Sequence, residues 1–191
     1  MANNVNTCID MENLNADAVN LIKELYSRVR EDQDYKWFSD MFVDGVNVTY
    51  EQAEKYEWTV ENIGPKWCYI EDFDADENGC MIRTVSAWGA PITGVENLLS
   101  AIVEICPDVV TEVTYEDEMP NFIGANFYIG DELDDSSEWD YDEILEEVKC
   151  HHDIEEDEDG ELTEESQDTV WENIWEISHD MQEDFLSECR G

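Results

Sequence analysis

The last third of the chain, residues 131–191, most constrains how this protein can fold. It holds 26 of the 51 acidic residues of the 191-residue protein and only two basic residues, Lys149 and Arg190. Charge of one sign at this density repels itself and opposes compaction. The segment nevertheless contains Trp171, Ile174 and Phe185, and a purely solvating tail has little need of such large apolar side chains. We therefore expect it to be folded and acidic, and not a disordered tail.

The composition of the whole chain predicts a globular protein that avoids nucleic acid. Hydrophobic residues make up 42% and aromatic residues 11% of the sequence, which is enough for a core in one domain with appendages. A net charge of −42 repels nucleic acids and anionic membranes and attracts basic surfaces. The first residues lack the basic start and apolar run of a secretory signal, and no apolar stretch is long enough to span a membrane. We therefore expect a cytoplasmic protein.

The cysteines give no sign of a disulfide framework. They are widely spaced and contain no Cys-x-x-Cys pair, which in a reducing compartment favours free thiols. The six are Cys8, Cys68, Cys80, Cys106, Cys150 and Cys189.

Hydrophobic periodicity up to residue 130 predicts an α+β domain, an antiparallel sheet with helices on one face. A helical insertion is expected at about 35–62, with short helices at 35–42 and 51–56. The other elements, in order, are a strand at 5–12, a helix at 16–30, strands at 66–73 and 80–88, a helix from Pro91 to Ile105, and strands at 109–115 and 122–129.

Three features of this region carry a resemblance to a known family. They are the polar start Met1-Ala-Asn-Asn4, the run Thr84-Val-Ser-Ala-Trp-Gly-Ala-Pro91 between a strand and a helix, and the run from Tyr115 to Gly124 before the last strand. With the order of elements, they resemble the Api-type ferredoxin-like family of phage and plasmid proteins over roughly residues 1–130. The resemblance implies an origin in a mobile element and a ferredoxin-like fold without iron or sulfur. It implies no activity and no catalytic residues.

Residues 131–191 are expected to form an acidic helical extension packed on that domain. The pattern predicts a helix at 141–149, an acidic loop at 151–160 and a long helix at 162–189. On a helical wheel, one side of the long helix is apolar and the opposite side is acidic. The apolar side holds Val170, Ile174, Ile177, Met181 and Phe185; the acidic side holds Glu165, Asp168, Glu172, Glu176 and Glu183.

Two acidic turns and one His-containing run contain residue types that bind metals. The turn from Asp74 to Gly79 matches the start of a calcium loop, but the closing position is Val85 and strands flank it, so a hairpin turn is favoured and calcium stays an alternative. The loop from Glu155 to Gly160 matches less well. Cys150-His151-His152 contains zinc-ligand types without the usual spacing. We predict no metal and no cofactor.

The sequence gives no indication of an enzyme. It has no Gly-x-Ser-x-Gly motif and no phosphate loop, and carboxylates are so numerous that any pair would match a catalytic dyad by chance.

The charge leads to a functional hypothesis. Because duplex DNA carries one charge per ~1.7 Å of its axis, 42 charges correspond to about 70 Å of duplex. Together with the resemblance, this suggests a phage-type inhibitor that mimics nucleic acid and occupies the basic surface of a bacterial defence complex, of restriction or CRISPR type, or of another host DNA-binding protein. The expected contacts are the acidic side of the long helix and a set of loop carboxylates: Asp134, Asp135, Glu155, Glu156, Asp157 and Asp159.

Two alternatives remain at this point. Trp171 and Trp175 lie one turn apart and either pack in the core or anchor a non-nucleic-acid partner, since tryptophan is favoured in interfaces. In the second case the chain is an acidic protein-interaction module. Adaptation to high salt also explains an acidic surface, although the abundant cysteine and tryptophan and the uneven charge argue against it. The sequence leaves open a monomer or a homodimer.

Overall fold

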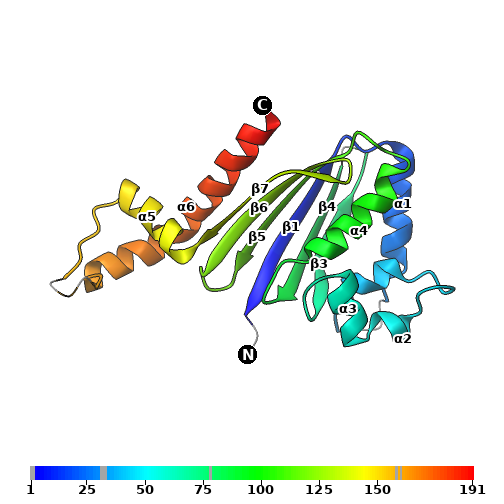
Figure 1. Cartoon of the computed structure of the whole chain (residues 1–191), viewed down its shortest axis with the longest axis horizontal. Helices are drawn as coiled ribbons and strands as arrows, with labels where there is room; N and C mark the ends of the chain where they lie inside the picture. Colours follow the sequence, from blue (N-terminus) through cyan, green and yellow to red (C-terminus); the bar gives the residue numbers. More distant parts are fainter. Residues whose placement is uncertain (1–2, 31–33, 78, 158, 160) are drawn as a thin grey trace.

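The protein is described by a computed structural model that covers residues 3–30, 34–77, 79–157, 159 and 161–191. Within these residues it is a mixed α and β fold with one seven-stranded sheet and six α-helices (Figure 1). The strands are β1 (Asn4–Glu12), β2 (Lys36–Trp37), β3 (Cys68–Ala75), β4 (Cys80–Ala87), β5 (Val110–Asp117), β6 (Phe122–Ile129) and β7 (Glu132–Asp140). The helices are α1 (Ala16–Ser27), α2 (Tyr50–Ala53), α3 (Tyr56–Asn62), α4 (Ile92–Val103), α5 (Tyr141–His151) and α6 (Glu164–Arg190), with a 3₁₀ helix at Phe38–Phe42.

The sheet is antiparallel throughout, with β1 at its centre. The strand order is β2-β3-β4-β1-β5-β6-β7. On β1, Ile9 lies opposite Ile82 of β4 and Val113 of β5. The first strand of the chain therefore pairs with two strands that come much later in the sequence.

The main core lies between one face of the sheet and the helices α1 and α4. Alternate residues of β1, including Val5, Ile9 and Met11, are fully buried there against Ile22 of α1 and Leu98 of α4. Because side chains of a strand alternate between faces, the residues between them, such as Cys8, lie on the opposite face. The expected layer of helices on one face is confirmed for α1 and α4.

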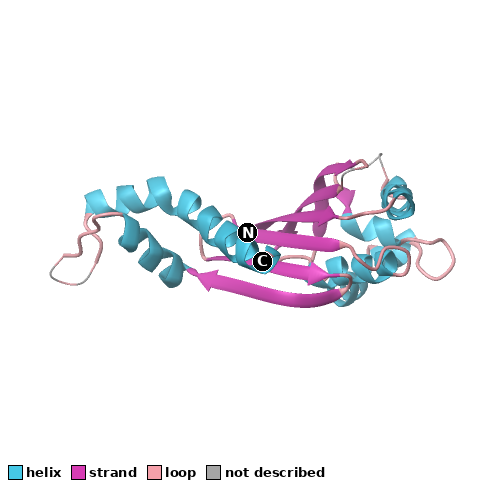
Figure 2. Ribbon diagram, turned by 90° about the horizontal axis from the view of Figure 1, so that it is seen from above, coloured by secondary structure: helices cyan, strands magenta, loops and turns pink. Residues whose placement is uncertain are grey.

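Helix α6 covers part of that opposite face. Its Leu186 packs against Ala125 and Phe127 of β6, whereas Tyr128 of the same strand lies in the α1 and α4 core. The C-terminal half of α6 thus lies on the sheet, while α5 and the N-terminal part of α6 extend beyond it (Figures 1 and 2). We call α5 together with residues 164–176 the arm.

The sheet does not end at residue 130, where the sequence predicts the boundary between the α+β domain and the acidic extension. Asp134 and Asp135 are predicted above as loop carboxylates, but Glu132–Asp140 form the strand β7, which pairs with β6 along its length. Trp139 explains why this acidic segment is a strand, since its ring packs edge-on against Phe185 of α6 at 6.1 Å. The acidic extension therefore contributes a strand to the sheet of the first domain.

The predicted helix at 35–42 is also wrong. Residues Lys36–Trp37 form the short strand β2, in which Trp37 lies opposite Tyr69 of β3, and only the following five residues form a 3₁₀ helix. Cross-strand pairs of aromatic residues stabilise sheets, which favours a strand over the helical pattern here. The predicted helix at 51–56 is split into α2 and α3.

An arginine network holds the insertion on the domain. The Arg30 guanidinium donates to both carboxylate oxygens of buried Asp40, each at 2.9 Å, and to Glu54 at 2.7 Å. It also lies 4.3 Å from the centre of the Tyr50 ring. These contacts raise the pKa of Arg30 above its ordinary value, chiefly through the hydrogen bond to Asp40.

Tyr115 ties β5 to the edge strand β7 across β6. Its hydroxyl donates to Glu138 at 3.0 Å, and its ring passes over Gly124, which separates the two residues in the sheet. A Cβ at position 124 would overlap the Tyr115 ring. Burial and the Glu138 carboxylate raise the pKa of Tyr115, so this tyrosine stays a neutral donor.

We therefore expect Gly124→Ala to reduce the free energy of unfolding by about 1 to 3 kcal/mol, the usual cost of overpacking. Urea unfolding of this variant and of Gly89→Ala provides the measurement. An added Cβ at Gly89 meets nothing within 4 Å, so that control should change stability by no more than about 0.5 kcal/mol. Equal stability of the two variants would contradict the role given to Tyr115.

Candidate functional site

The candidate site is built on α6, whose start is fixed by side-chain hydrogen bonds. Thr163 caps the helix by accepting a hydrogen bond from the Ser166 backbone N–H at 3.3 Å. The buried Ser166 hydroxyl in turn accepts from the Glu155 backbone N–H at 2.7 Å. The acidic loop before α6 is thereby held against the first turn of the helix.

The apolar side of α6 packs as predicted. Val170, Ile174 and Ile177 are buried with Ile144 and Val148 of α5 in a core of their own. Ile123 of β6 belongs to the same cluster. The arm is therefore continuous with the sheet through buried apolar side chains.

Gln182 fixes α6 to the sheet through two hydrogen bonds. Its side-chain amide is buried and donates to the backbone carbonyl oxygens of Tyr115 at 3.0 Å and of Gly124 at 2.9 Å. The sequence analysis missed this residue. The signal was present, since Gln182 lies four residues from both Ser178 and Leu186, on the line of buried positions along the helix.

Four of the five predicted acidic-side residues form an exposed row without intramolecular ion pairs. Glu165, Asp168, Glu172 and Glu176 are all exposed, and among the described residues none of them lies within 4.0 Å of a basic group. We call these four residues the carboxylate row. Their spacing of three to four residues corresponds to about 4.5 to 6 Å along the helix.

The fifth predicted residue, Glu183, differs from the carboxylate row because it forms an ion pair within the protein. It accepts a hydrogen bond from Arg190 at 2.8 Å, and Arg190 also forms two bonds of 2.6 Å to Glu112 of β5. These carboxylates raise the pKa of Arg190, with the Glu112 bond as the largest cause. Glu183 therefore takes part in holding the end of α6 on the sheet, in addition to being exposed.

The predicted set of loop carboxylates is divided by the structure. Asp134 and Asp135 lie on β7, not in a loop. Their charges, after burial, raise the pKa of Cys189 near the end of α6. They are therefore close to the carboxyl end of that helix, whereas the other four members lie near its start.

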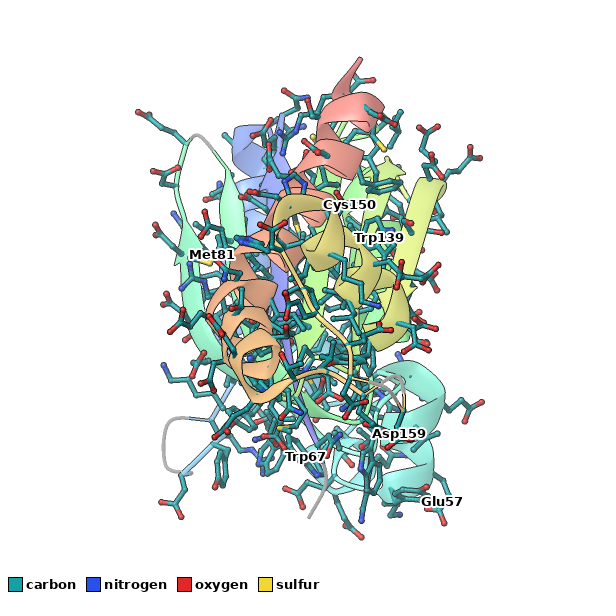
Figure 3. The ribbon with its side chains drawn as sticks, turned by 90° about the vertical axis from the view of Figure 1, so that its left-hand side faces the viewer. Glu57, Trp67, Met81, Trp139, Cys150 and Asp159 are labelled. Carbon is teal, nitrogen blue, oxygen red and sulfur yellow. The ribbon has the colours of Figure 1, made fainter. Side chains whose placement is uncertain are left out.

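The remaining loop carboxylates are partly used in local structure. Glu156 pairs with Lys149 at 2.9 Å, and the Asp157 carboxylate accepts from the backbone N–H groups of Asp159 and Glu161. Glu146 and Glu156 both raise the pKa of Lys149 through hydrogen bonds. Glu155 and Asp159 are exposed. Figure 3, which faces the arm, shows Asp159 apart from Cys150.

The two predicted aromatic anchors have different environments. Trp175 is half-buried and packs against the arm core, whereas Trp171 is 51% exposed. Only Trp171 is therefore available to a partner without disturbing the arm.

The described residues include no group of three or more His, Cys, Asp or Glu side chains placed to hold a metal ion. His151 contacts Glu147 at 3.1 Å, while His179 contacts Glu116 at 3.0 Å at the sheet end of α6. The Asp74–Gly79 turn joins β3 and β4, and the Gly79 N–H donates a hydrogen bond to Asp76 at 3.3 Å. Asn78 of this turn lies outside the described residues, as do Glu158 and Gly160 of the second turn.

No helix of the described part could cross a bilayer.

Comparisons with protein-family models, with curated proteins and with solved structures returned no match.

Replacing Gln182 tests how α6 is held. Gln182→Leu keeps the size of the side chain but leaves two buried carbonyl oxygens without their donor, so we expect a loss of about 1 to 3 kcal/mol in the free energy of unfolding. Gln167→Leu is the matched control, because its amide bonds one carbonyl in an exposed position of the same helix. Urea unfolding measures both, and a cost at 182 no larger than at 167 would show that Gln182 does not fix the helix.

Thiol reactivity should follow burial. Burial raises the pKa of Cys68 and of Cys80 to about 12, so at pH 8 only about one in 10,000 of these thiols is the reactive thiolate. Cys150 on α5 is exposed. We expect iodoacetamide at pH 8 to modify Cys150 first, as read by mass spectrometry, and all six cysteines to react in urea. Modification of Cys68 or Cys80 as fast as Cys150 in the folded protein would contradict this packing.

Proposed function

We propose that this protein is an inhibitor that mimics nucleic acid and binds the basic surface of a host DNA- or RNA-binding protein. The observation that carries the proposal is the carboxylate row, four exposed acidic side chains on one helix that form no ion pair with the described residues. With 51 acidic and nine basic residues, most carboxylates of this chain cannot pair with lysine or arginine as Glu54 does with Arg30; the row differs in that four of them lie on one side of one helix. The row keeps its charge free for a partner.

The charge density of α6 is close to that of a nucleic-acid strand. Its 27 residues correspond to about 40 Å, and they contain nine acidic residues and one basic residue. A single DNA strand carries one phosphate per 3.4 Å, or about 12 over the same length. A partner whose surface is spaced for phosphates therefore finds a similar linear charge on α6.

Rigidity supports the same proposal. The row lies on a helix whose other side is buried against α5 and the sheet, so binding does not require the acidic side chains to be brought together first. Preorganisation of this kind lowers the cost of association. The acidic surface then releases its counterions as DNA does when a basic protein binds it, which gives a strong dependence on salt.

The class of target follows from the family resemblance and is part of the proposal. The order β3-β4-β1-β5, with α1 and α4 as the connecting helices, supports a ferredoxin-like core of the βαββαβ type. With the Api-type motifs, this favours a phage or plasmid protein that acts in the host cytoplasm on a restriction or CRISPR-type defence complex. No cofactor or catalytic step is needed for such an inhibitor.

A second candidate function rests on Trp171. An exposed tryptophan on the arm is suited to a protein partner that is recognised by apolar contact, because tryptophan is enriched in binding hot spots. In that case Trp171→Ala weakens binding strongly and neutralising the row has little effect. Trp175 gives no clean test, because it packs in the arm core.

The test uses two variants of equal net charge. The first neutralises the row by Glu165→Gln, Asp168→Asn, Glu172→Gln and Glu176→Gln. The second makes four matched changes elsewhere, Glu57→Gln, Glu61→Gln, Glu104→Gln and Asp108→Asn, all at exposed positions. Against a panel of purified restriction and CRISPR-type nucleases, we expect the row variant to bind about 10- to 100-fold more weakly than the control, since four charge contacts at up to ~1 kcal/mol each are lost.

Two controls accompany this measurement. Binding of the unmodified protein should weaken steeply between about 50 and 200 mM salt, and competing duplex should displace it. Affinity that hardly changes with salt and is unaffected by duplex would contradict mimicry. Equal loss in both variants would show that total charge, and not the row, determines binding.

A further inference from the structure

A second feature of the sheet lies far from the carboxylate row and has no part in the proposed mimicry. At the β2 edge, a cavity of about 390 Å³ opens on the same face of the sheet as α6. Four of the described residues that line it are aromatic, and the fifth is an amide; they are Tyr35, Trp37, Trp67, Tyr69 and Asn4. We call this cavity the aromatic pocket. In Figure 3, Trp67 is well separated from Trp139 of β7.

The four rings form a continuous series. The centre of the Tyr69 ring lies 5.9 Å from that of Trp67, with only 16° between the ring planes, and 4.9 Å from that of Tyr35. Tyr35 in turn lies 5.7 Å from Trp37. Local sequence produces this arrangement, because Trp67 directly precedes β3, Tyr69 is the second residue of that strand, and Trp37 lies opposite Tyr69. Alternation in strands then directs all three to one face.

The pocket is open to solvent, and the described residues that line it carry no charged side chain. Tyr35 is 51% exposed, and the other lining residues are half-buried. Burial and the charge of Glu71 raise the pKa of Tyr69, which keeps its ring a neutral phenol. The nearby Lys66 does not line the pocket, and its ammonium lies 5.7 Å from the centre of the Trp88 ring. Among the described lining residues, an incoming ligand therefore meets four aromatic rings and one amide.

The physical properties of the pocket select an organic cation. Aromatic faces carry negative quadrupole charge and attract guanidinium and ammonium groups, and the net charge of −42 adds a negative potential that repels nucleotides and other anions. Guanidinium fits better than a simple ammonium, because it is planar, weakly hydrated and stacks on ring faces. The nearly parallel rings of Trp67 and Tyr69 offer such a surface. The side-chain amide of Asn4 has an oxygen that can accept hydrogen bonds from the N–H groups of the guanidinium.

We propose that the aromatic pocket binds the guanidinium group of an arginine side chain presented by a protein partner. The chain already contains the same contact internally, in Arg30 over the Tyr50 ring at 4.3 Å. The pocket uses aromatic contact, whereas the carboxylate row uses charge. The proposal for the aromatic pocket and the proposal for the carboxylate row can therefore be disproved independently of each other.

The experiment compares three blocked tripeptides, Gly-Arg-Gly, Gly-citrulline-Gly and Gly-Lys-Gly, by NMR titration of the tryptophan indole N–H signals in 0.5 M NaCl. The salt screens attraction to the acidic surface as a whole. Citrulline has nearly the shape of arginine without the charge. We expect the arginine peptide to shift the Trp37 and Trp67 signals saturably, with the citrulline peptide about 3- to 30-fold weaker. The lysine peptide should fall between the two.

Trp171 serves as the internal reference, since it is exposed on α6 and should not shift. In a second arm, Tyr69→Leu keeps an apolar side chain and should weaken arginine binding, while Trp171→Phe should leave it unchanged. Equal shifts with arginine and citrulline would overturn the proposal and indicate a neutral ligand, such as a proline-rich peptide or a glycan. Shifts that spread to Trp171, or no shift at all, would also overturn it. Stronger binding of free trimethyllysine than of the arginine peptide would assign the pocket to a methylated ammonium instead.

Discussion

The structure depends on burial of an apolar stripe beneath a helix that is otherwise covered with like charges. In α6, acidic residues follow one another at intervals of three and four, and each such pair destabilises a helix by about 0.2 to 0.5 kcal/mol. With about eight pairs, such as Asp168 with Glu172, the repulsion amounts to about 2 to 4 kcal/mol. Burying Val170, Ile174, Ile177 and Leu186 contributes about 1.5 to 3 kcal/mol each. Apolar burial therefore outweighs the repulsion, and it allows the acidic surface to be held in a fixed shape.

The same balance explains why basic residues occur where they do. Arg190 joins Glu112 and Glu183 where α6 ends on β5, and Lys149 joins Glu146 and Glu156 where α5 meets the loop. Both are placed where two elements meet, so that each cation relieves repulsion between segments that packing forces together. The middle of α6 packs on α5 and the sheet chiefly through apolar side chains and has no such cation among the described residues. This leaves the carboxylate row unpaired.

The sequence predicts those parts of the fold that are determined by local periodicity. The strand at β1, the β3–β4 hairpin, α4 ending before Pro107 and the two-sided character of α6 all follow from spacing within one element, and the structure confirms them. It also confirms that the four carboxylate-row residues share an exposed side. Each of these features depends on residues that are neighbours on the same helix or strand, so the pattern alone contains the information.

The features that could not be predicted depend on contacts between distant segments. β7 has five acidic residues in nine positions and weak strand propensity, and it becomes a strand because β6 presents a free edge and Phe185 packs on Trp139. Trp37 lies in a strand although its sequence pattern is helical, because it pairs with Tyr69 of β3, which is distant in the sequence. The aromatic pocket was missed because its rings come from two separated segments of the chain, at 35–37 and 67–69. Gln182 is the exception, because its position on the buried line of α6 was readable from the sequence.

The composition of β1 explains why two separate surfaces can share one face of the sheet. On that face the central strand carries Asn6, Asp10 and Glu12, all exposed, and water satisfies such groups without a second layer of helices. β6 instead presents Ala125 and Phe127 there, and α6 covers those two apolar residues. Because burial of polar groups without partners is costly, α6 has no reason to extend across β1 toward β3. The face between α6 and the aromatic pocket therefore stays polar and open, and the acidic helix and the aromatic rings remain accessible from the same side.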